Sequence, residues 1–178
     1  MAVETTPLLD PYRFCPRCGS DKFVGNNAQS KHCLSCGLEY YVNPRAAVVA
    51  LITDEDGNIL VCRRAKEPAQ GTLDLPGGFT DLNETAEEAV AREVLEETSL
   101  AVTRCRYLFS LQNRYLYSGV VIPTMDLFFA CEVADFSPLS AHDDVAAVRF
   151  LPRAEIKPEL FGLASVRKGI ARILEENF

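Results

Sequence analysis

The chain has 178 residues, of which 48% are hydrophobic and 24% charged, and its net charge is −7. This composition fits one globular domain with a small accessory module, and the negative charge argues against binding nucleic acid or anionic membrane through the bulk surface. No apolar stretch approaches the roughly 20 residues that span a bilayer, and the chain does not begin with a signal-peptide pattern. We therefore expect a cytoplasmic protein without a membrane partner.

Two C-x2-C-G knuckles near the N-terminus predict a metal-binding module. Tetrahedral Zn²⁺ prefers four soft ligands, and paired knuckles supply them, so we expect a structural zinc ribbon over residues 11–42 after a loose tail at 1–10. A redox C-x-x-C motif, a disulfide and His32 as a substitute ligand are weaker alternatives. The expected zinc ligands are Cys15, Cys18, Cys33 and Cys36. The other cysteines stand in apolar runs and are expected to be reduced core residues: Cys62, Cys105 and Cys131.

The rest of the chain alternates strand patterns with helical patterns. The first clear helix has a capping box of Thr85 and Glu88, and we expect Glu88 to pair with Arg92 one turn later. A closing helix is expected to begin at a Ser165 cap. This order predicts an α/β fold, with a mixed β-sheet and helices on both sides. The predicted strands are 46–53, 59–63, 73–79 with its glycine turn, 102–112, 120–133 and 147–151, and the closing helices are 152–156 and 165–176.

The helix that follows Thr85 carries a stripe that turns from apolar to acidic. At 100° per residue, Glu93 and Glu97 continue its core-facing side, and Glu96 lies at the edge. A buried carboxylate is unfavourable as a bare anion, whereas a hard divalent cation such as Mg²⁺ or Mn²⁺ would stabilise it. The turn Pro76-Gly77-Gly78 lies just upstream, where its backbone can approach a phosphate closely. A merely solvated acidic helix is the alternative interpretation.

The segment 78–100 resembles the Nudix box, G-x5-E-x7-R-E-U-x-E-E-x-G-U, in which U is a bulky aliphatic residue. Ser99 stands where that family has glycine, which bears on how the helix ends, because glycine is the usual left-handed residue there. From residue 44 to 178 the chain is similar to a Nudix domain, an α/β/α sandwich, and the ribbon before it is similar to that of NADH pyrophosphatases and their bacterial relatives. The matching positions are Gly78, Glu84, Arg92, Glu93, Val94, Glu96, Glu97 and Leu100.

The resemblance implies hydrolysis of the pyrophosphate bond in a nucleoside diphosphate linked to another moiety, such as a dinucleotide, FAD, ADP-ribose or a nucleotide sugar. Arg92 would brace Glu84 and the glycine loop. The implied catalytic residues are Glu84, Arg92, Glu93 and Glu97, with Glu93, Asp143 or Asp144 as the general base. The implied ligands of Mg²⁺ or Mn²⁺ are Gly77, Glu93, Glu96 and Glu97. Phosphate or substrate contacts are expected from Gly77, Gly78, Phe79, Arg114 and Tyr115.

The chain departs from the family at two further places. Leu73 stands where a tryptophan is common, which removes one aromatic contact. The segment 110–117 stands where the NADH enzymes carry a Ser-Gln-Pro-Trp-Pro-Phe-Pro stretch, which argues against NADH as the specific substrate. Two other functions stay open: a nucleotide sensor without turnover, and processing of RNA 5′ caps or NAD caps with the ribbon holding the RNA. The ribbon's weak charge favours a small nucleotide-derived substrate over nucleic acid. A homodimer also stays open.

Overall fold

The protein is described by a computed structural model that covers residues 7–176 and 178. Contacts divide the chain into two compact units. The first runs to Pro44 and includes Leu116–Ile122, and the second holds Arg45–Tyr115 and Pro123–Phe178. None of the helices within the described residues is long and apolar enough to cross a membrane.

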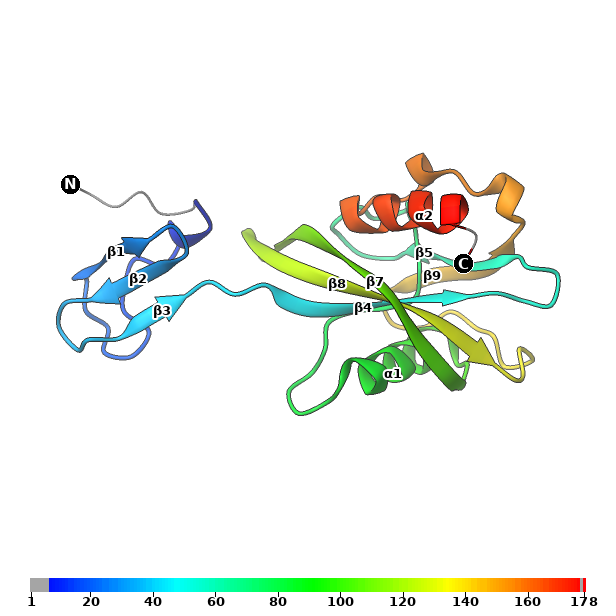
Figure 1. Ribbon diagram of the computed structural model, residues 1–178, viewed down its shortest axis with the longest axis horizontal. Coiled ribbons are helices and arrows are strands. Elements are labelled where there is room, and N and C mark those ends of the chain that lie inside the picture. The colour runs from blue at the N-terminus through cyan, green and yellow to red at the C-terminus, as the bar shows by residue number, and fades with distance from the viewer. Residues whose placement is uncertain (1–6, 177) are drawn as a thin grey trace. The chain divides into compact units, whose positions relative to one another are not determined.

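The first unit is built on a three-stranded antiparallel sheet in the order β1-β2-β3 (Figure 1). Its strands are β1 Phe23–Asn27, β2 Ser30–Cys33 and β3 Glu39–Tyr41. The core of this unit is small and consists of Phe23 with two of the cysteines, flanked by Tyr12 and Tyr40. The expected loose tail is partly wrong, because Pro7–Leu9 forms a 3-10 helix with Leu9 fully buried; residues 1–6 lie outside the described part of the chain.

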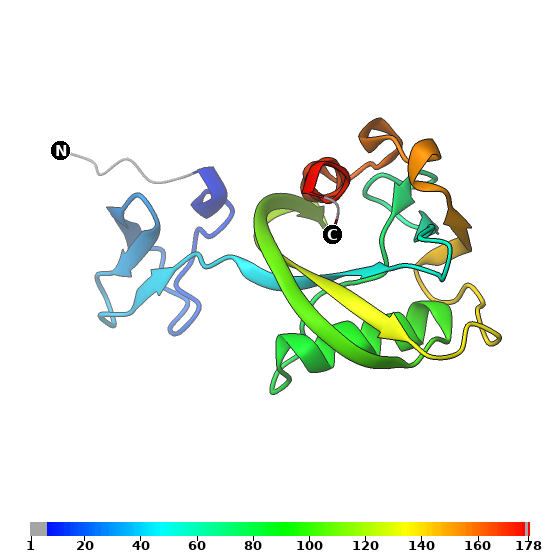
Figure 2. The same ribbon diagram turned by 45° about the vertical axis from the view of Figure 1, so that its right-hand side comes forward.

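The second unit contains two three-stranded sheets, in the orders β4-β8-β7 and β6-β5-β9, except that the ends of β7 and β8 within Leu116–Ile122 belong to the first unit. Strand β4 runs parallel to β8, whereas β5 pairs antiparallel with both β6 and β9. The second unit therefore combines parallel and antiparallel pairing, and the mixed pairing predicted from the order of elements is present. Strands β7 and β8 curve strongly along their length (Figure 2). The strands are β4 Arg45–Ile52, β5 Ile59–Arg64, β6 Leu73–Asp74, β7 Val102–Tyr117, β8 Val120–Val133 and β9 Val145–Leu151.

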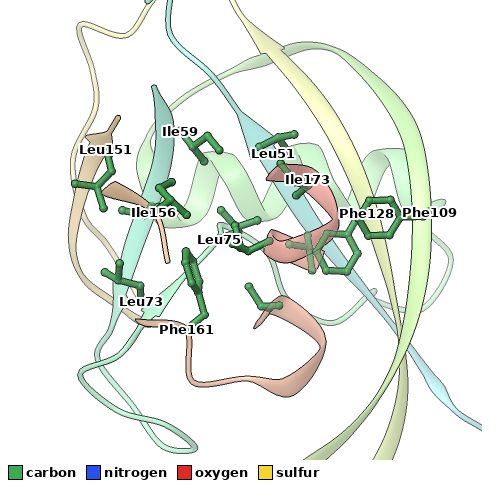
Figure 3. Packing of buried hydrophobic residues seen from close by; sticks show 14 residues of the cluster. Leu51, Ile59, Leu73, Leu75, Phe109, Phe128, Leu151, Ile156, Phe161 and Ile173 are labelled. Atoms are coloured by element: carbon green, nitrogen blue, oxygen red, sulfur yellow. The ribbon is translucent and has the colours of Figure 1, made fainter. Parts of the chain in front are cut away.

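Two helices, α1 Ala86–Thr98 and α2 Ala164–Glu176, cover opposite faces of the sheet that contains β4 and β8 (Figure 1). Because side chains alternate along a strand, β4 supplies both cores of this α/β/α sandwich. One core lies on the α1 side and includes Val48, Ala50, Ile52, Val90 and Val94. The other lies on the α2 side (Figure 3) and includes Val49, Leu51, Phe128, Ile170 and Ile173.

The structure corrects three of the predicted elements. Strand β7 continues to Tyr117 instead of ending at Gln112. The closing segment after Pro152 is a 3-10 helix, Arg153–Glu155, followed by a second one at Pro158–Leu160. Ser165 does not cap α2 from outside: it lies buried in the first turn, and its Oγ donates a hydrogen bond to Asp126.

Candidate active site

Helix α1 begins and ends through local interactions that its sequence encodes. The Thr85 Oγ1 accepts from the Glu88 N–H at 3.2 Å, and the Glu88 carboxylate accepts from the Thr85 N–H at 2.7 Å. The predicted capping box is thus confirmed. At the other end, Ser99 has φ 60° and its N–H donates to the Leu95 carbonyl. Serine therefore adopts the left-handed conformation that glycine favours at this position.

The acidic side of α1 passes from the core to the surface, as its period predicted. Glu97 is buried with 8% exposure, Glu93 is half-buried, and Glu96 is exposed. Burial raises the pKa of Glu97 to about 8, even though the Gly77 N–H donates to its Oε2 at 2.9 Å. Burial also raises the pKa of Glu93, against the opposing effect of the Arg92 guanidinium. A bound cation would stabilise the ionised form of these two carboxyls and so offset the cost of their burial.

The glycine loop, Pro76–Thr80, is fixed along β4 by backbone hydrogen bonds. Val48 donates to the Gly78 carbonyl and Ala50 to the Pro76 carbonyl, both at 2.8 Å. Gly77 and Gly78 both have close neighbours where a side chain would begin. A Cβ on Gly77 would lie 2.0 Å from the Val48 carbonyl oxygen, and a Cβ on Gly78 would lie 2.5 Å from Glu93 Oε1. The loop therefore passes in contact with both buried carboxylates of α1.

Arg92 holds the acidic helix to this loop through several hydrogen bonds. Its guanidinium donates to both carboxylate oxygens of Glu84 at 2.7 and 3.1 Å, and to the Phe79 carbonyl at 3.1 Å. It also donates to Glu93 at 2.9 Å and Glu96 at 3.0 Å. The contact expected between Arg92 and Glu84 is present, and it lowers the pKa of Glu84 to about 2.

The expected ion pair between Glu88 and Arg92 is wrong. The Glu88 carboxylate turns back to the helix start, where its Oε2 accepts from the backbone N–H and the hydroxyl of Thr85. These two contacts fix the Glu88 side chain away from Arg92. The Arg92 guanidinium instead donates hydrogen bonds to three other glutamates and to a backbone carbonyl.

A late loop brings two further acids to the end of α1. The His142 N–H donates to the Glu97 carbonyl at 3.0 Å, which docks the loop against the helix. The following acids, Asp143 and Asp144, are exposed and both form ion pairs with Lys66. Their charges reach the site, because Asp143 contributes to the raised pKa of Glu93 and Asp144 to that of Glu97.

Of the predicted substrate contacts, the structure brings Phe79 and Tyr115 together but leaves Arg114 apart. The two rings meet edge to face, with centroids 5.4 Å apart. Arg114 is exposed, and because neighbouring side chains on a strand point to opposite faces, it points away from the side on which Tyr115 meets Phe79. Its role in substrate binding stays a prediction.

Sequence reasoning missed a buried ion pair next to these rings. Arg64 donates to Asp74 at 2.5 Å and to the Tyr115 hydroxyl at 3.3 Å. Burial raises the pKa of Asp74, whereas Arg64 lowers it. The available signal was an acid between two apolar residues in Leu73-Asp74-Leu75, because a buried acid needs a partner. Nothing in the sequence indicated that Arg64 would be that partner.

The four knuckle cysteines converge on one point in the first unit. Their sulfurs lie within 4.8 Å of one another, and they are the one group of this kind among the described residues. Two of the pairs, Cys15 with Cys36 and Cys18 with Cys33, have sulfurs 3.6 Å apart. Four soft sulfurs at this spacing suit a tetrahedral metal ion. The remaining cysteines are free, with Cys62 and Cys131 buried and Cys105 half-buried.

Comparison with known proteins identifies the family. The family model described as "NUDIX domain" matches residues 43–173. The "NAD-capped RNA hydrolase NudC" of Chromobacterium violaceum is 33% identical over 109 residues, which are 61% of this chain and 40% of that protein. The protein of the same name from Vibrio vulnificus is 29% identical over 78% of this chain and 52% of its own length. The chain thus spans about half the length, or less, of these curated relatives.

The solved structures agree with this family. A crystal structure of a NUDIX hydrolase from Nitrosomonas europaea has a TM-score of 0.71 and 25% identity, and the match covers 92% of this chain and 91% of that one. The NUDIX domain of Shewanella oneidensis NrtR, crystallised with ADP ribose, has a TM-score of 0.61 at 20% identity, over 76% of this chain and 90% of that one, and supports the fold. The chain therefore belongs to the NUDIX domain family.

Proposed function

We propose that the protein is a divalent-metal-dependent pyrophosphohydrolase that cleaves a nucleoside diphosphate linked to another moiety. The observation that carries this proposal is the Glu97 carboxyl. It is buried beside the Gly77 N–H, its pKa is raised to about 8, and no cationic side chain pairs with it among the described residues. In its ionised form a buried carboxylate without a cationic partner lowers stability, whereas a metal-dependent active site needs such a carboxylate.

The residues present fit a hard cation such as Mg²⁺ or Mn²⁺. Glutamate oxygens are the ligand type that these ions prefer, and the missing Cβ of Gly78 leaves Glu93 the space that it occupies against the loop. We assign the ligands to the Gly77 carbonyl, Glu93, Glu96 and Glu97. A bound divalent ion would neutralise diphosphate charge and lower the pKa of an attacking water.

Other groups of the chain orient the reaction. Arg92 positions Glu93, Glu96 and the Phe79 carbonyl at once, and Glu84 holds Arg92 in place. We assign the general base to Glu93, whose raised pKa brings its proton affinity closer to neutral pH. Asp143 and Asp144 are the alternative bases; both are exposed and ion-paired with Lys66, whereas Glu93 is half-buried and ion-paired with Arg92.

A substrate screen tests the function. NADH, FAD, ADP-ribose, dinucleoside polyphosphates and nucleotide sugars are incubated with Mg²⁺ or Mn²⁺, and the phosphate-containing products are identified. We expect cleavage between the two phosphorus atoms of at least one compound, and none without metal. A wild-type protein that binds these compounds in the presence of metal but cleaves none of them would instead be the nucleotide sensor.

Processing of NAD-capped RNA is the second candidate function. It is favoured by the curated relatives, whose names state that they hydrolyse NAD-capped RNA. The diphosphate of an NAD cap is chemically the same as that of a free dinucleotide, so the acidic site suits both. The two candidates differ in whether the chain also binds the RNA body.

We further propose that the sulfur cluster in the first unit holds a structural Zn²⁺. The four sulfurs lie within 4.8 Å of one another, which suits a tetrahedral ion that binds cysteines as thiolates. A zinc-thiolate site and free core cysteines suit a reducing compartment, so we propose a cytoplasmic location. Assembly into a homodimer stays a prediction.

A further inference from the structure

The Arg45 guanidinium lies over an aromatic ring of the glycine loop. Its guanidinium carbon is 4.1 Å from the centroid of the Phe79 ring, and Arg45 itself is exposed. Phe79 directly follows Gly78, the residue that touches Glu93. Contact with the ring does not occupy the N–H donors of a guanidinium, so they stay able to bind an anion.

The ring beneath Arg45 is itself fixed from several sides. The Phe79 carbonyl accepts from Arg92 at 3.1 Å, and the backbone at Phe79 pairs with Ala47 of β4. The edge of the ring meets Tyr115, whose hydroxyl accepts from Arg64 at 3.3 Å. Because Phe79 is anchored to both the acidic helix and β7, it can hold the Arg45 guanidinium in a constant position relative to the catalytic glutamates.

Arg45 also differs from the neighbouring arginines in having its donors available. Arg92 is bound to three glutamates and a carbonyl, and Arg64 is bound to Asp74, the Pro68 carbonyl and Tyr115. Arg63 donates to the Gly71 carbonyl. The guanidinium of Arg45, by contrast, packs on the Phe79 ring and forms no ion pair or hydrogen bond with any other described residue.

We propose that Arg45 is a substrate-binding residue that contacts a phosphate oxygen of the diphosphate, and that Phe79 is the positioning residue that holds it. The inference rests on the proposed function, which it deepens by assigning a cationic contact at the glycine loop. It also gives Phe79 a role other than the direct substrate contact expected from the sequence, because the Arg45 guanidinium lies over its ring.

Binding of ADP-ribose without divalent metal tests this assignment independently of turnover. Titration calorimetry compares the wild type with Arg45→Ala and Arg45→Lys, and Arg104→Ala serves as a control with the same charge change at an exposed site paired with Glu132. We expect Arg45→Ala to weaken binding at least ~10-fold, the scale of one charge-assisted hydrogen bond. Arg45→Lys should be intermediate, and Arg104→Ala unchanged.

Three results would overturn the assignment. Equal affinity of wild type and Arg45→Ala for ADP-ribose removes Arg45 from the site. Equal weakening for ADP-ribose and for adenosine means that Arg45 contacts the base and not the phosphate. A loss of affinity that does not shrink as salt is raised indicates a structural role, because an exposed charge contact is screened.

Turnover separates this inference from the proposed function. If the wild type hydrolyses a diphosphate, Arg45→Ala should raise KM by a similar factor, whereas Phe79→Leu should raise it by less; an unchanged KM in Arg45→Ala refutes the inference alone. If no compound is hydrolysed but Arg45→Ala still weakens ADP-ribose binding, the proposed function fails and the phosphate contact stands.

Discussion

The Glu97 carboxyl is 8% exposed and carries a pKa raised to about 8 by its burial. A carboxyl whose pKa is higher in the folded than in the unfolded protein binds its proton more tightly when folded. Its contribution to stability is therefore complete below the unfolded pKa of about 4.3 and is lost as pH rises through about 8. A cation that binds only the folded protein reverses this loss.

Replacing Glu97 by glutamine should separate stability from activity. In the Glu97→Gln variant the new amide oxygen can still accept from the Gly77 N–H, but the side chain never ionises. In metal-free buffer at pH 8 we expect the variant to exceed the wild type in free energy of unfolding by about 1 kcal/mol or more, with little difference near pH 4.5. Turnover with Mg²⁺ should fall at least ~10²-fold.

Denaturant unfolding in EDTA at pH 4.5 and pH 8 tests the predicted difference in free energy of unfolding. Measurement of kcat with Mg²⁺ tests the predicted loss of turnover. Added Mg²⁺ should stabilise the wild type and not the variant. A variant that is less stable than the wild type at pH 8, or that retains full turnover, would contradict the assignment of Glu97 to the metal site.

Ser99 holds a left-handed conformation, with φ 60°, at the end of α1. This conformation is unfavourable for a residue with a Cβ and free of that penalty for glycine. Ser99→Gly should therefore stabilise the protein by about 0.5–1 kcal/mol, reduced by the loss of a 3.2 Å hydrogen bond between the Ser140 and Ser99 hydroxyls. In urea unfolding, Ser99→Gly should be the most stable protein, the wild type intermediate and Ser99→Ala the least stable. A Ser99→Ala variant as stable as Ser99→Gly would contradict this explanation.

At the scale of elements, α1 could be predicted because its signals are local. The Thr85 cap, the 3.6-residue period and the order of exposure from Glu97 to Glu96 all depend on neighbours within two turns. Strand β7 could not be bounded in this way. Its polar residues around Asn113 read as the end of a strand, yet pairing with β8 in the same sheet extends it to Tyr117.

The same distinction applies to the candidate site. The period of α1 and the Gly77-Gly78 turn predicted the acidic residues and the loop beside them. The pairs that the fold assembles were not predictable, because their members lie far apart in the sequence: Arg45 over Phe79, Arg64 with Asp74, and Lys66 with Asp144. Even the Arg92 partner on its own helix was wrongly predicted, since Glu88 is held by the cap.

The two glycines of the loop should respond differently to alanine. A Cβ at Gly77 would meet the β4 backbone 2.0 Å away, in a residue with φ 150°. Backbone cannot yield without breaking the loop's pairing, so Gly77→Ala should destabilise the protein by about 2–4 kcal/mol. A Cβ at Gly78 would meet the Glu93 side chain, which can rotate away.

Gly78→Ala should therefore stay folded, and its free energy of unfolding should fall by less than about 1 kcal/mol. It should nevertheless lose most of its turnover, because the Glu93 side chain is displaced. Urea unfolding and kcat, measured on both variants and on the wild type, give the comparison. If Gly78→Ala keeps full activity, Glu93 is not required in its observed position; if Gly77→Ala is as stable as the wild type, the close approach to β4 is not a constraint.

At the scale of the whole molecule, the two units rely on different sources of stability. The second unit has two apolar clusters built on both faces of β4. The apolar cluster of the first unit is much smaller: among the described residues it consists of Phe23 and two cysteines with a few flanking side chains, so we expect a bound metal to supply part of the folding free energy of this unit. We therefore expect removal of the proposed zinc to affect the folding of the first unit, and removal of Mg²⁺ or Mn²⁺ to affect the activity of the second.

Removing zinc should therefore unfold the first unit and leave the second folded. We expect about one zinc per chain in protein purified without added metal. Treatment with a strong zinc chelator should expose the backbone amides of β1 and β2 to rapid hydrogen exchange, while those of β4 and β5 stay protected. Cys33→Ser should behave like the chelated protein. Protection of β1 and β2 in a zinc-free chain would show that the sulfur cluster is not structural.

Competition between RNA and small diphosphates distinguishes the two candidate substrates, because only an RNA-binding protein contacts the chain beyond the cap. The net charge of −7 makes a long polyanion an unfavourable ligand, so we expect random RNA at micromolar concentration to leave hydrolysis of a small diphosphate unchanged at about 0.15 M salt. A neutral control, such as dextran, accounts for crowding. Inhibition by RNA that weakens steeply as salt is raised, and that disappears in Cys33→Ser, would instead show that the ribbon binds the RNA body. The capped RNA would then be the substrate, and the small dinucleotide only its cap.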